Sequence, residues 1–98
     1  MRRLIALITV RRSELATFRA YEHAAAHIMA KHGAAIEHAY ELAGDDDTLR
    51  ELHVVQFPDD AAFAAYRADP DLAARAADRA RAIIATEIWP AELLPAYG

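Results

Sequence analysis

The sequence contains no cysteine, and this absence excludes several kinds of site. There can be no disulfide, no thiolate nucleophile and no Cys-ligated metal. Glycine is also scarce, with three residues in the chain, and neither a Gly-rich phosphate loop nor a Ser-centred nucleophile elbow is present. The formal net charge of −4 lacks the basic excess of a protein that binds a phosphate backbone, so nucleic acid is not an expected partner.

Long apolar runs are missing as well. The apolar run at residues 4–10 falls far short of the ~20 residues that a membrane span needs. It is also too short for a signal peptide, because Arg11 and Arg12 follow it at once and no small-residue cleavage site comes after them. We therefore expect a cytoplasmic protein with no membrane partner.

Alanine is what the sequence has in abundance. The 98 residues allow one domain, residues 1–98, and 55% of them are hydrophobic. Twenty-five of these are Ala, which buries little area and mainly favours helix. The remaining larger apolar side chains make a modest core, so a lone domain of this size should be marginally stable.

Apolar periodicity predicts a strand and then a long helix in the first third of the chain. Residues 4–10 include several β-branched side chains, which is typical of a buried strand. Ser13 is suited to the N-cap of a helix, and Ala-rich sequence continues from there to His32. Gly33 then provides a residue at which such a helix can end.

The middle of the chain predicts a hairpin. Residues 35–42 alternate, with Ile36 and His38 on one side and two glutamates on the other. Because one side is charged, this strand is expected at an edge of the sheet. Residues 44–47 have the composition of a turn, and residues 49–57 form the third predicted strand.

The last third of the chain predicts two helical pieces and a strand. A helix is expected over residues 58–68, and the Asp-Pro step at residues 69–70 should break it, because the residue before proline avoids the helical region. A second piece is expected from residue 71 to about 81, followed by a strand at residues 83–89. Pro90 is expected to end regular structure.

The resulting order of strand, helix, strand, strand, helix, strand is that of a ferredoxin-like βαββαβ sandwich. This is an α+β fold with two helices on one face of a four-stranded antiparallel sheet. The strands are apolar on both sides: Ile5 and Leu7 alternate with Leu4 and Ile8 in the first of them. Since the helices cover one face, we expect the other to be buried against a second copy in an isologous homodimer.

Two segments resemble the dimeric α/β-barrel superfamily. They are Leu-His-Val-Val-Gln-Phe-Pro at residues 52–58 and Ala-Ala-Phe-Ala-Ala-Tyr-Arg-Ala-Asp-Pro at residues 61–70. Within that superfamily the pattern is similar to a group of short bacterial proteins known as a domain of unknown function. In that group a strand ending in Phe-Pro enters a helix that carries an aromatic residue, and a Ser/Asp-Pro step breaks the helix.

The resemblance implies a fold and a dimer more than a reaction. Relatives in the superfamily include cofactor-independent monooxygenases of the antibiotic-biosynthesis type, haem-degrading enzymes, dye-decolourising peroxidases and muconolactone isomerases. One fold therefore hosts several chemistries, and the site must be argued from its residues.

The predicted long helix carries three candidate site residues. At about 100° per residue, Phe18 and Tyr21 fall on the apolar side and Glu22 borders it. A carboxylate between helix and sheet would be partly desolvated, which raises its pKa and suits a general base; the alternative is that Glu22 reaches water or pairs with Arg19. Phe18 and Tyr21 are candidate ligand contacts.

The same helix carries two histidines at a spacing that can hold a metal. His23 and His27 are four residues apart, but they fall away from the apolar side. They are expected to be solvated, and no metal site is predicted.

The strands supply the other candidates. His38 and His53 lie on the two strands of the predicted hairpin and could act as acid–base groups, although periodicity alone does not say which strand face meets the helices. Trp89 either walls a ligand pocket or fills the core. In the second helical region, four arginines alternate with acidic residues, and local pairing is expected among them. These residues are Arg67, Arg75, Arg79 and Arg81 with Asp69, Asp71 and Asp78.

Two functional hypotheses follow. The first is a homodimer that binds a small apolar or aromatic molecule between helices and sheet, as a cofactor-free monooxygenase or isomerase-like enzyme with Glu22, His53 or His38 as base. The second is a non-catalytic dimeric binding or interaction module. An enzyme should have a closed cavity that holds at least two titratable groups within hydrogen-bond reach.

Overall fold

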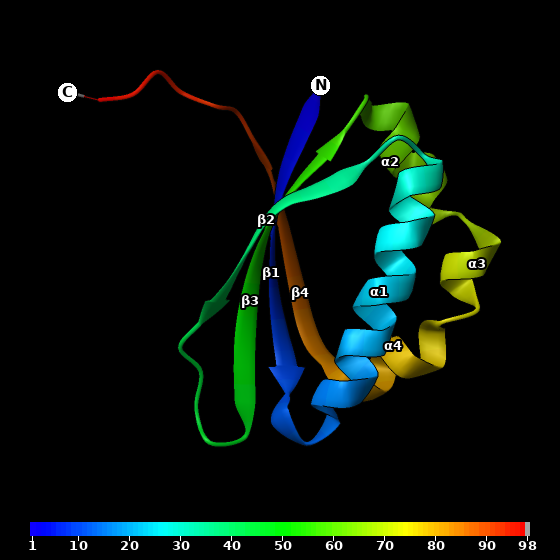
Figure 1. Cartoon of the computed structure of the whole chain (residues 1–98), viewed down its shortest axis with the longest axis vertical. Helices are drawn as coiled ribbons and strands as arrows, with labels where there is room; N and C mark the ends of the chain where they lie inside the picture. The colour runs from blue at the N-terminus through cyan, green and yellow to red at the C-terminus, as the bar shows by residue number, and fades with distance from the viewer. Residues whose placement is uncertain (98) are drawn as a thin grey trace.

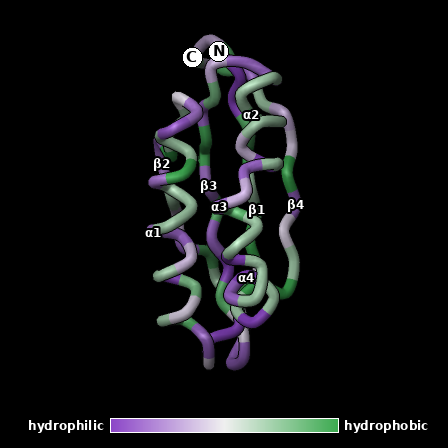
Figure 2. Tube along the Cα trace, turned by 90° about the vertical axis from the view of Figure 1, so that its right-hand side faces the viewer, coloured by the Kyte–Doolittle hydropathy of each residue, from purple (hydrophilic) through white to green (hydrophobic). Residues whose placement is uncertain are grey.

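The computed structural model describes residues 1–97 and contains one four-stranded antiparallel sheet with strand order β2-β3-β1-β4. Its elements are β1 (Arg2–Arg11), η1 (Arg12–Glu14), α1 (Leu15–Lys31), β2 (Ala35–Leu42), β3 (Thr48–Phe57), α2 (Asp60–Arg67), α3 (Pro70–Ala73), α4 (Ala76–Ala82) and β4 (Ile83–Ala91). All the α-helices lie on one side of the sheet (Figure 1), with α1 beside α3 and α4 when seen from that side (Figure 2). The predicted α+β ferredoxin-like fold is confirmed, and β2 lies at an edge as expected.

The predicted start of the long helix was wrong. Residues 12–14 form the short 3₁₀ turn η1, and α1 begins at Leu15 with no side-chain cap on its first turn. Thr17 instead donates a hydrogen bond of 2.9 Å to the Glu14 carboxylate. Ser13 therefore lies inside the 3₁₀ turn and does not cap α1.

The predicted end of this helix was correct. Gly33 follows α1 with a φ of 73°, a left-handed conformation that favours glycine. A Cβ at this position would also lie 2.9 Å from the Pro58 ring. Gly33 thus allows the chain to turn into β2 close to Pro58, which precedes α2.

Two irregularities alter the predicted strand faces. A bulge at Glu37 separates the pairs Ile36–Val55 and His38–Val54, so Ile36 faces the helices while His38 faces away. A second bulge, at Ile84, does the same in β4 and places Ile83 on the helical side. The expectation that Ile36 and His38 share a face was therefore wrong.

Strand β4 also continues beyond its predicted end. Pro90 pairs with Leu4 and the strand ends at Ala91. Proline is tolerated here because β4 is an edge strand, whose outer backbone groups need no partner in the sheet.

The helices and the sheet enclose two separate groups of buried apolar residues. We call them the Phe18 cluster and the Phe57 cluster after their fully buried aromatic rings, which are 0% and 1% exposed. The Phe18 cluster contains Ile8, Val10, Phe18, Tyr21, Ala25, Leu49, Ala82 and Ile83. The Phe57 cluster contains Leu4, Ile28, Ala34, Val55, Phe57 and Tyr66. The core is thus divided along the length of the sheet.

The opposite side of the sheet carries no helix, and we call it the open face. Alternation in the paired registers places Ile5, Leu7, Leu52 and Val54 at its centre. Tyr40 and Trp89, in the edge strands, are 55% and 47% exposed. Beyond β4 the C-terminal segment leaves the sheet on this side (Figure 1), with Leu93 and Leu94 exposed. Among residues 1–97, no helix is long and apolar enough to span a bilayer.

Candidate functional site

A pocket of about 160 Å³ lies between α-helices and sheet, where the two core clusters meet. Its wall is mostly apolar, with Leu4 and Phe57 from one cluster and Ile8 and Tyr21 from the other. Alanines help to keep the space open, because Ala6 on β1 and Ala25 on α1 both line it and carry only a methyl group. Alanine, which the composition indicates as helix filler, therefore also shapes the cavity.

The polar part of the pocket wall is a pair of titratable side chains, Glu22 from α1 and His53 from β3. Glu22 Oε2 lies 3.7 Å from His53 Nδ1, and both residues line the pocket. The His53 side chain is 5% exposed and that of Glu22 is 17% exposed, so the pair lies largely out of water. Two titratable groups thus face one cavity, with a separation somewhat longer than the hydrogen-bond distance expected of an active site.

A second carboxylate lies on the other side of the imidazole. His53 Nε2 is 2.9 Å from Glu51 Oε1, and Glu51 also forms an ion pair with Arg19. An ionised carboxylate only accepts hydrogen bonds, so this contact places a hydrogen on Nε2. The other ring nitrogen of His53, Nδ1, faces Glu22.

Burial and charge shift the pKa values of this site. Burial raises the pKa of Glu22, while the neighbouring His53 lowers it in part. Burial likewise raises the pKa of the Tyr21 phenol, and strongly raises that of Tyr66, so both phenols remain protonated at neutral pH. The pocket thus offers one carboxyl group with enhanced basicity and two neutral hydroxyl groups.

The structure brings together three of the six candidate residues from the sequence. Glu22, His53 and Tyr21 all line the pocket. Phe18 is wholly buried in its own cluster and does not line the pocket. His38 and Trp89 lie on the open face, so they share no cavity with His53.

His23 and His27 are predicted to lie in solvent, and both are exposed on α1. Among residues 1–97, no group of three or more His, Cys, Asp or Glu side chains is arranged to hold a metal ion.

Sequence reasoning missed Glu51, although a usable signal was present. Glu51 precedes His53 by two residues in a strand, so the two side chains share a face. The missing information was which face meets the helices. Arg19 was considered as a partner of Glu22, but in the structure it pairs with Glu51.

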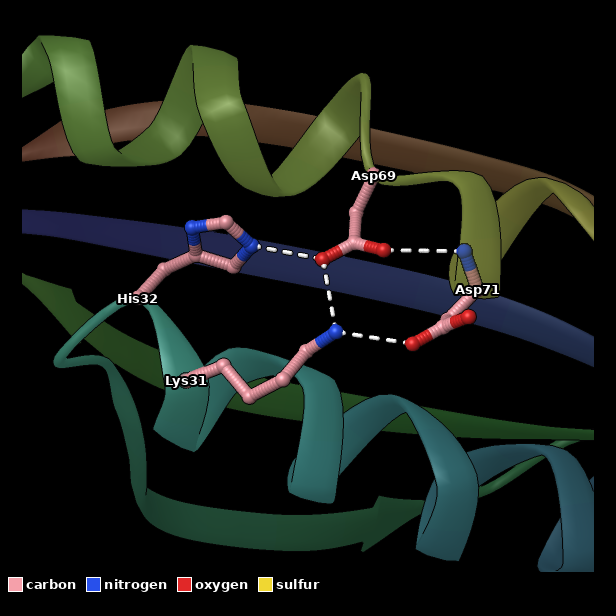
Figure 3. Close-up of polar contacts among 4 residues, drawn as sticks. All are labelled: Lys31, His32, Asp69 and Asp71. Atoms are coloured by element: carbon pink, nitrogen blue, oxygen red, sulfur yellow. Dashed lines mark hydrogen bonds and ion pairs between the residues drawn. The ribbon is translucent and has the colours of Figure 1, made fainter.

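A second polar cluster joins α1 to the turn between α2 and α3 (Figure 3). The Asp69 carboxylate accepts hydrogen bonds from His32 Nε2 at 2.8 Å and from the Asp71 backbone N–H at 2.8 Å. Lys31 Nζ lies 3.0 Å from Asp69 Oδ2 and 2.8 Å from Asp71 Oδ2. The expectation of local pairing with the nearby arginines was therefore wrong for Asp69 and Asp71, because their cations come from α1.

This cluster should make stability depend on acid pH. The hydrogen bond from His32, together with those from Asp71 and Lys31, lowers the pKa of Asp69 to about 2 from an ordinary value of 3.8. A carboxyl group whose pKa is lowered on folding stabilises the fold at any pH above its ordinary pKa of 3.8. This contribution is lost as the pH falls through about 2. Asp69→Asn should therefore unfold at a lower denaturant concentration at pH 7, and the difference from the wild type should shrink between pH 4 and pH 2.

Asparagine isolates the charge in this experiment, since Asn caps a helix about as well as Asp. Asp71→Asn is the matched control, because the Asp71 side chain is exposed and its backbone donor is unchanged. A difference between Asp69→Asn and wild type that stays constant across this pH range would contradict the assignment.

Comparison with known proteins supports the fold and leaves the chemistry open. No protein-family model matches the chain, and no curated protein is significantly similar to it in sequence. Solved structures do match. A protein of unknown function from Rhodopseudomonas palustris superposes with a TM-score of 0.71 at 14% identity, covering 95% of this chain and 84% of that one.

Two further structures come from oxygenase-type proteins. SnoaB, a cofactor-independent oxygenase from Streptomyces nogalater, has a TM-score of 0.65 at 17% identity and covers 95% of both chains. A proposed antibiotic biosynthesis monooxygenase from Nitrosomonas europaea has a TM-score of 0.71 at 12% identity, covering 97% of this chain and 100% of that one. The chain shares its ferredoxin-like fold with these structures. At these identities the shared fold carries no particular substrate with it.

Proposed function

We propose that this protein binds a small apolar or aromatic molecule in the pocket between helices and sheet, and removes a proton from it without a cofactor. The observation that carries the proposal is the meeting of Glu22 and His53 in an otherwise apolar cavity. Such a carboxylate is a stronger base than one in water, because its charged form is poorly solvated.

The neighbouring side chains have separate roles in this step. Glu22 and His53 Nδ1 provide the place where the abstracted proton is held. Glu51 fixes the imidazole by accepting from Nε2, and it also pairs with Arg19. The phenols of Tyr21 and Tyr66 line the same cavity and can donate to an oxygen of the bound molecule.

Two reaction classes begin with such a proton transfer. An isomerase returns the proton to another atom of the same molecule, whereas a cofactor-free monooxygenase lets the deprotonated molecule react with dioxygen. The fold shared with SnoaB, a cofactor-independent oxygenase, supports the second class. The alternative is a non-catalytic binding module, which the mostly apolar wall of the pocket would serve equally well.

Hydrogen–deuterium exchange in a ketone separates an enzyme of either class from a non-catalytic binding module. With 1-phenylpropan-2-one in D₂O, the protein should accelerate exchange at the carbon between ring and carbonyl, as monitored by proton NMR. Glu22→Gln should slow this exchange by about 100-fold or more, the usual range for a lost general base. The wild-type rate should rise with pH as Glu22 ionises, with a midpoint above that of an ordinary glutamate because burial raises the pKa of Glu22.

Glu14→Gln is the matched control, since Glu14 precedes α1 and does not line the pocket. Binding of the ketone in the pocket without exchange would contradict the enzyme and favour the binding module. Absence of any binding, judged by amide chemical shifts, would contradict both.

We further propose that the open face is covered by a second copy of the chain. The face has apolar side chains at its centre, and Trp89 and Tyr40 stand exposed at its edges. The C-terminal segment extends past the sheet on the same side, with Leu93 and Leu94 80% and 61% exposed. A partner on this face would bury these groups, and a two-fold arrangement does so for both copies at once.

A further inference from the structure

Two arginines line the pocket. Arg67 comes from α2 and Arg79 from α4, and both contribute to the pocket wall. Among residues 1–97, neither forms an ion pair, whereas Arg2, Arg19 and Arg81 each pair with a carboxylate. Most of the cavity wall is apolar, and these two arginines are its positively charged part.

Arg79 is held at the pocket by its neighbours. Its Nη2 donates a hydrogen bond of 3.1 Å to Thr86 Oγ1, and Thr86 lines the same pocket. The charge of Arg79 also lowers the pKa of Tyr21 in part, against the effect of burial, which places the guanidinium within electrostatic reach of the cavity wall. A guanidinium has five N–H donors, so the bond to Thr86 leaves most of them for a ligand.

Arg67 adds a second positive charge to the pocket. Its guanidinium lies over the Phe63 ring, 5.6 Å from the centroid, and Phe63 is itself a pocket residue. Stacking of this kind fixes the position of the charge without neutralising it. The pocket therefore combines apolar walls, a largely buried base at Glu22 and two arginines that form no ion pair within residues 1–97.

The size of the pocket limits what can enter. An engineered cavity of about 150 Å³ accepts benzene, and the pocket here holds about 160 Å³. One six-membered ring therefore fills it. A negative group on that ring would be repelled by Glu22 and attracted by Arg79, so its favourable place is at the guanidinium.

We propose that the ligand is a single-ring aromatic acid, or an apolar acid of similar size, whose carboxylate pairs with Arg79. This inference rests on the proposed function and adds the chemical class of the ligand. The ring occupies the apolar part of the cavity, which Glu22 and His53 also line. A guanidinium suits this role because it binds a carboxylate through two parallel hydrogen bonds.

A pair of probes that differ only in charge tests the proposal. Phenylacetate and phenylacetamide have the same ring and nearly the same shape, and their binding at neutral pH can be followed by amide chemical shifts. Phenylacetate should bind the wild type about tenfold more tightly than the amide, since hydrogen bonds to charged groups are the stronger ones. In Arg79→Gln the preference should fall to about twofold or less.

Arg75→Gln is the matched control. Arg75 is the N-cap residue of α4, forms no ion pair among the described residues, and lines a different groove. The preference for phenylacetate should persist in this variant.

The outcomes distinguish a failure of the proposed ligand class from a failure of the proposed function. Equal binding of both probes would overturn the anionic ligand and leave the proposed function standing. A preference that survives Arg79→Gln would overturn the role of Arg79. If neither probe shifts the pocket residues, the proposed function fails and this inference fails with it.

Discussion

Replacing Phe18 with alanine should lower the free energy of unfolding by about 3–5 kcal/mol, which is the usual cost of removing a buried aromatic ring. Phe18 is 0% exposed and lies in the cluster that joins α1 to β1 and β3. The ring packs among neighbours from several elements, so the space it leaves cannot be filled by moving one side chain. A small domain typically has only about 5–15 kcal/mol of stability, so this one substitution removes a large part of it.

Chemical denaturation measures the effect, with His23→Ala as the control. That substitution also removes a ring from α1, but the His23 ring is exposed, and the change should stay within about 0.5 kcal/mol. A loss in Phe18→Ala no larger than in His23→Ala would contradict the assigned burial. The comparison also separates a structural Phe18 from the ligand contact that the sequence predicts.

Introducing a charge on the open face should convert the proposed dimer into a monomer. Leu7 lies near the centre of that face, paired with Leu52 on β3 and Glu87 on β4. In Leu7→Lys the new ammonium can reach Glu87 across the strands, so the single chain should still fold. Against a second copy the same lysine would be buried, which costs far more than the contact returns.

Sedimentation at low micromolar concentration provides the measurement. The wild type should sediment at twice the 10.8 kDa of the chain, and Leu7→Lys at the mass of one chain. Ala64→Lys is the control, because Ala64 is exposed on α2 and faces away from the sheet's open side. A wild type that remains at 10.8 kDa under these conditions would contradict the dimer.

The order of strands and helices was predictable because local signals agree with the final fold. Residues 4–10 read as a strand from their β-branched side chains, and Gly33 ends the long helix as its missing Cβ suggests. The strand faces were harder. Period-two alternation fails wherever a bulge adds a residue, and nothing in the local sequence marks Glu37 or Ile84 as extra.

In the site, too, features set by neighbouring residues were predictable and features set by distant contacts were not. Glu22 was predictable as a carboxylate beside an apolar helix face, which needs only helical periodicity. Its position beside His53 depends on how α1 packs on β3, a contact between residues 31 positions apart in the chain. Asp69 pairs with Lys31 and His32 from a still more distant part of the chain, whereas local spacing favours the neighbouring arginines.

The division of the core into the Phe18 and Phe57 clusters has a consequence for how the protein responds to a ligand. The pocket lies along the boundary between them, so a molecule that fills it would touch both clusters at once and connect them. A bound ligand therefore stabilises the folded state. At a concentration 100 times its dissociation constant, it raises the free energy of unfolding by about 2.7 kcal/mol. In a domain this small the melting temperature would rise by many degrees, so heat resistance alone can report which molecules the pocket accepts.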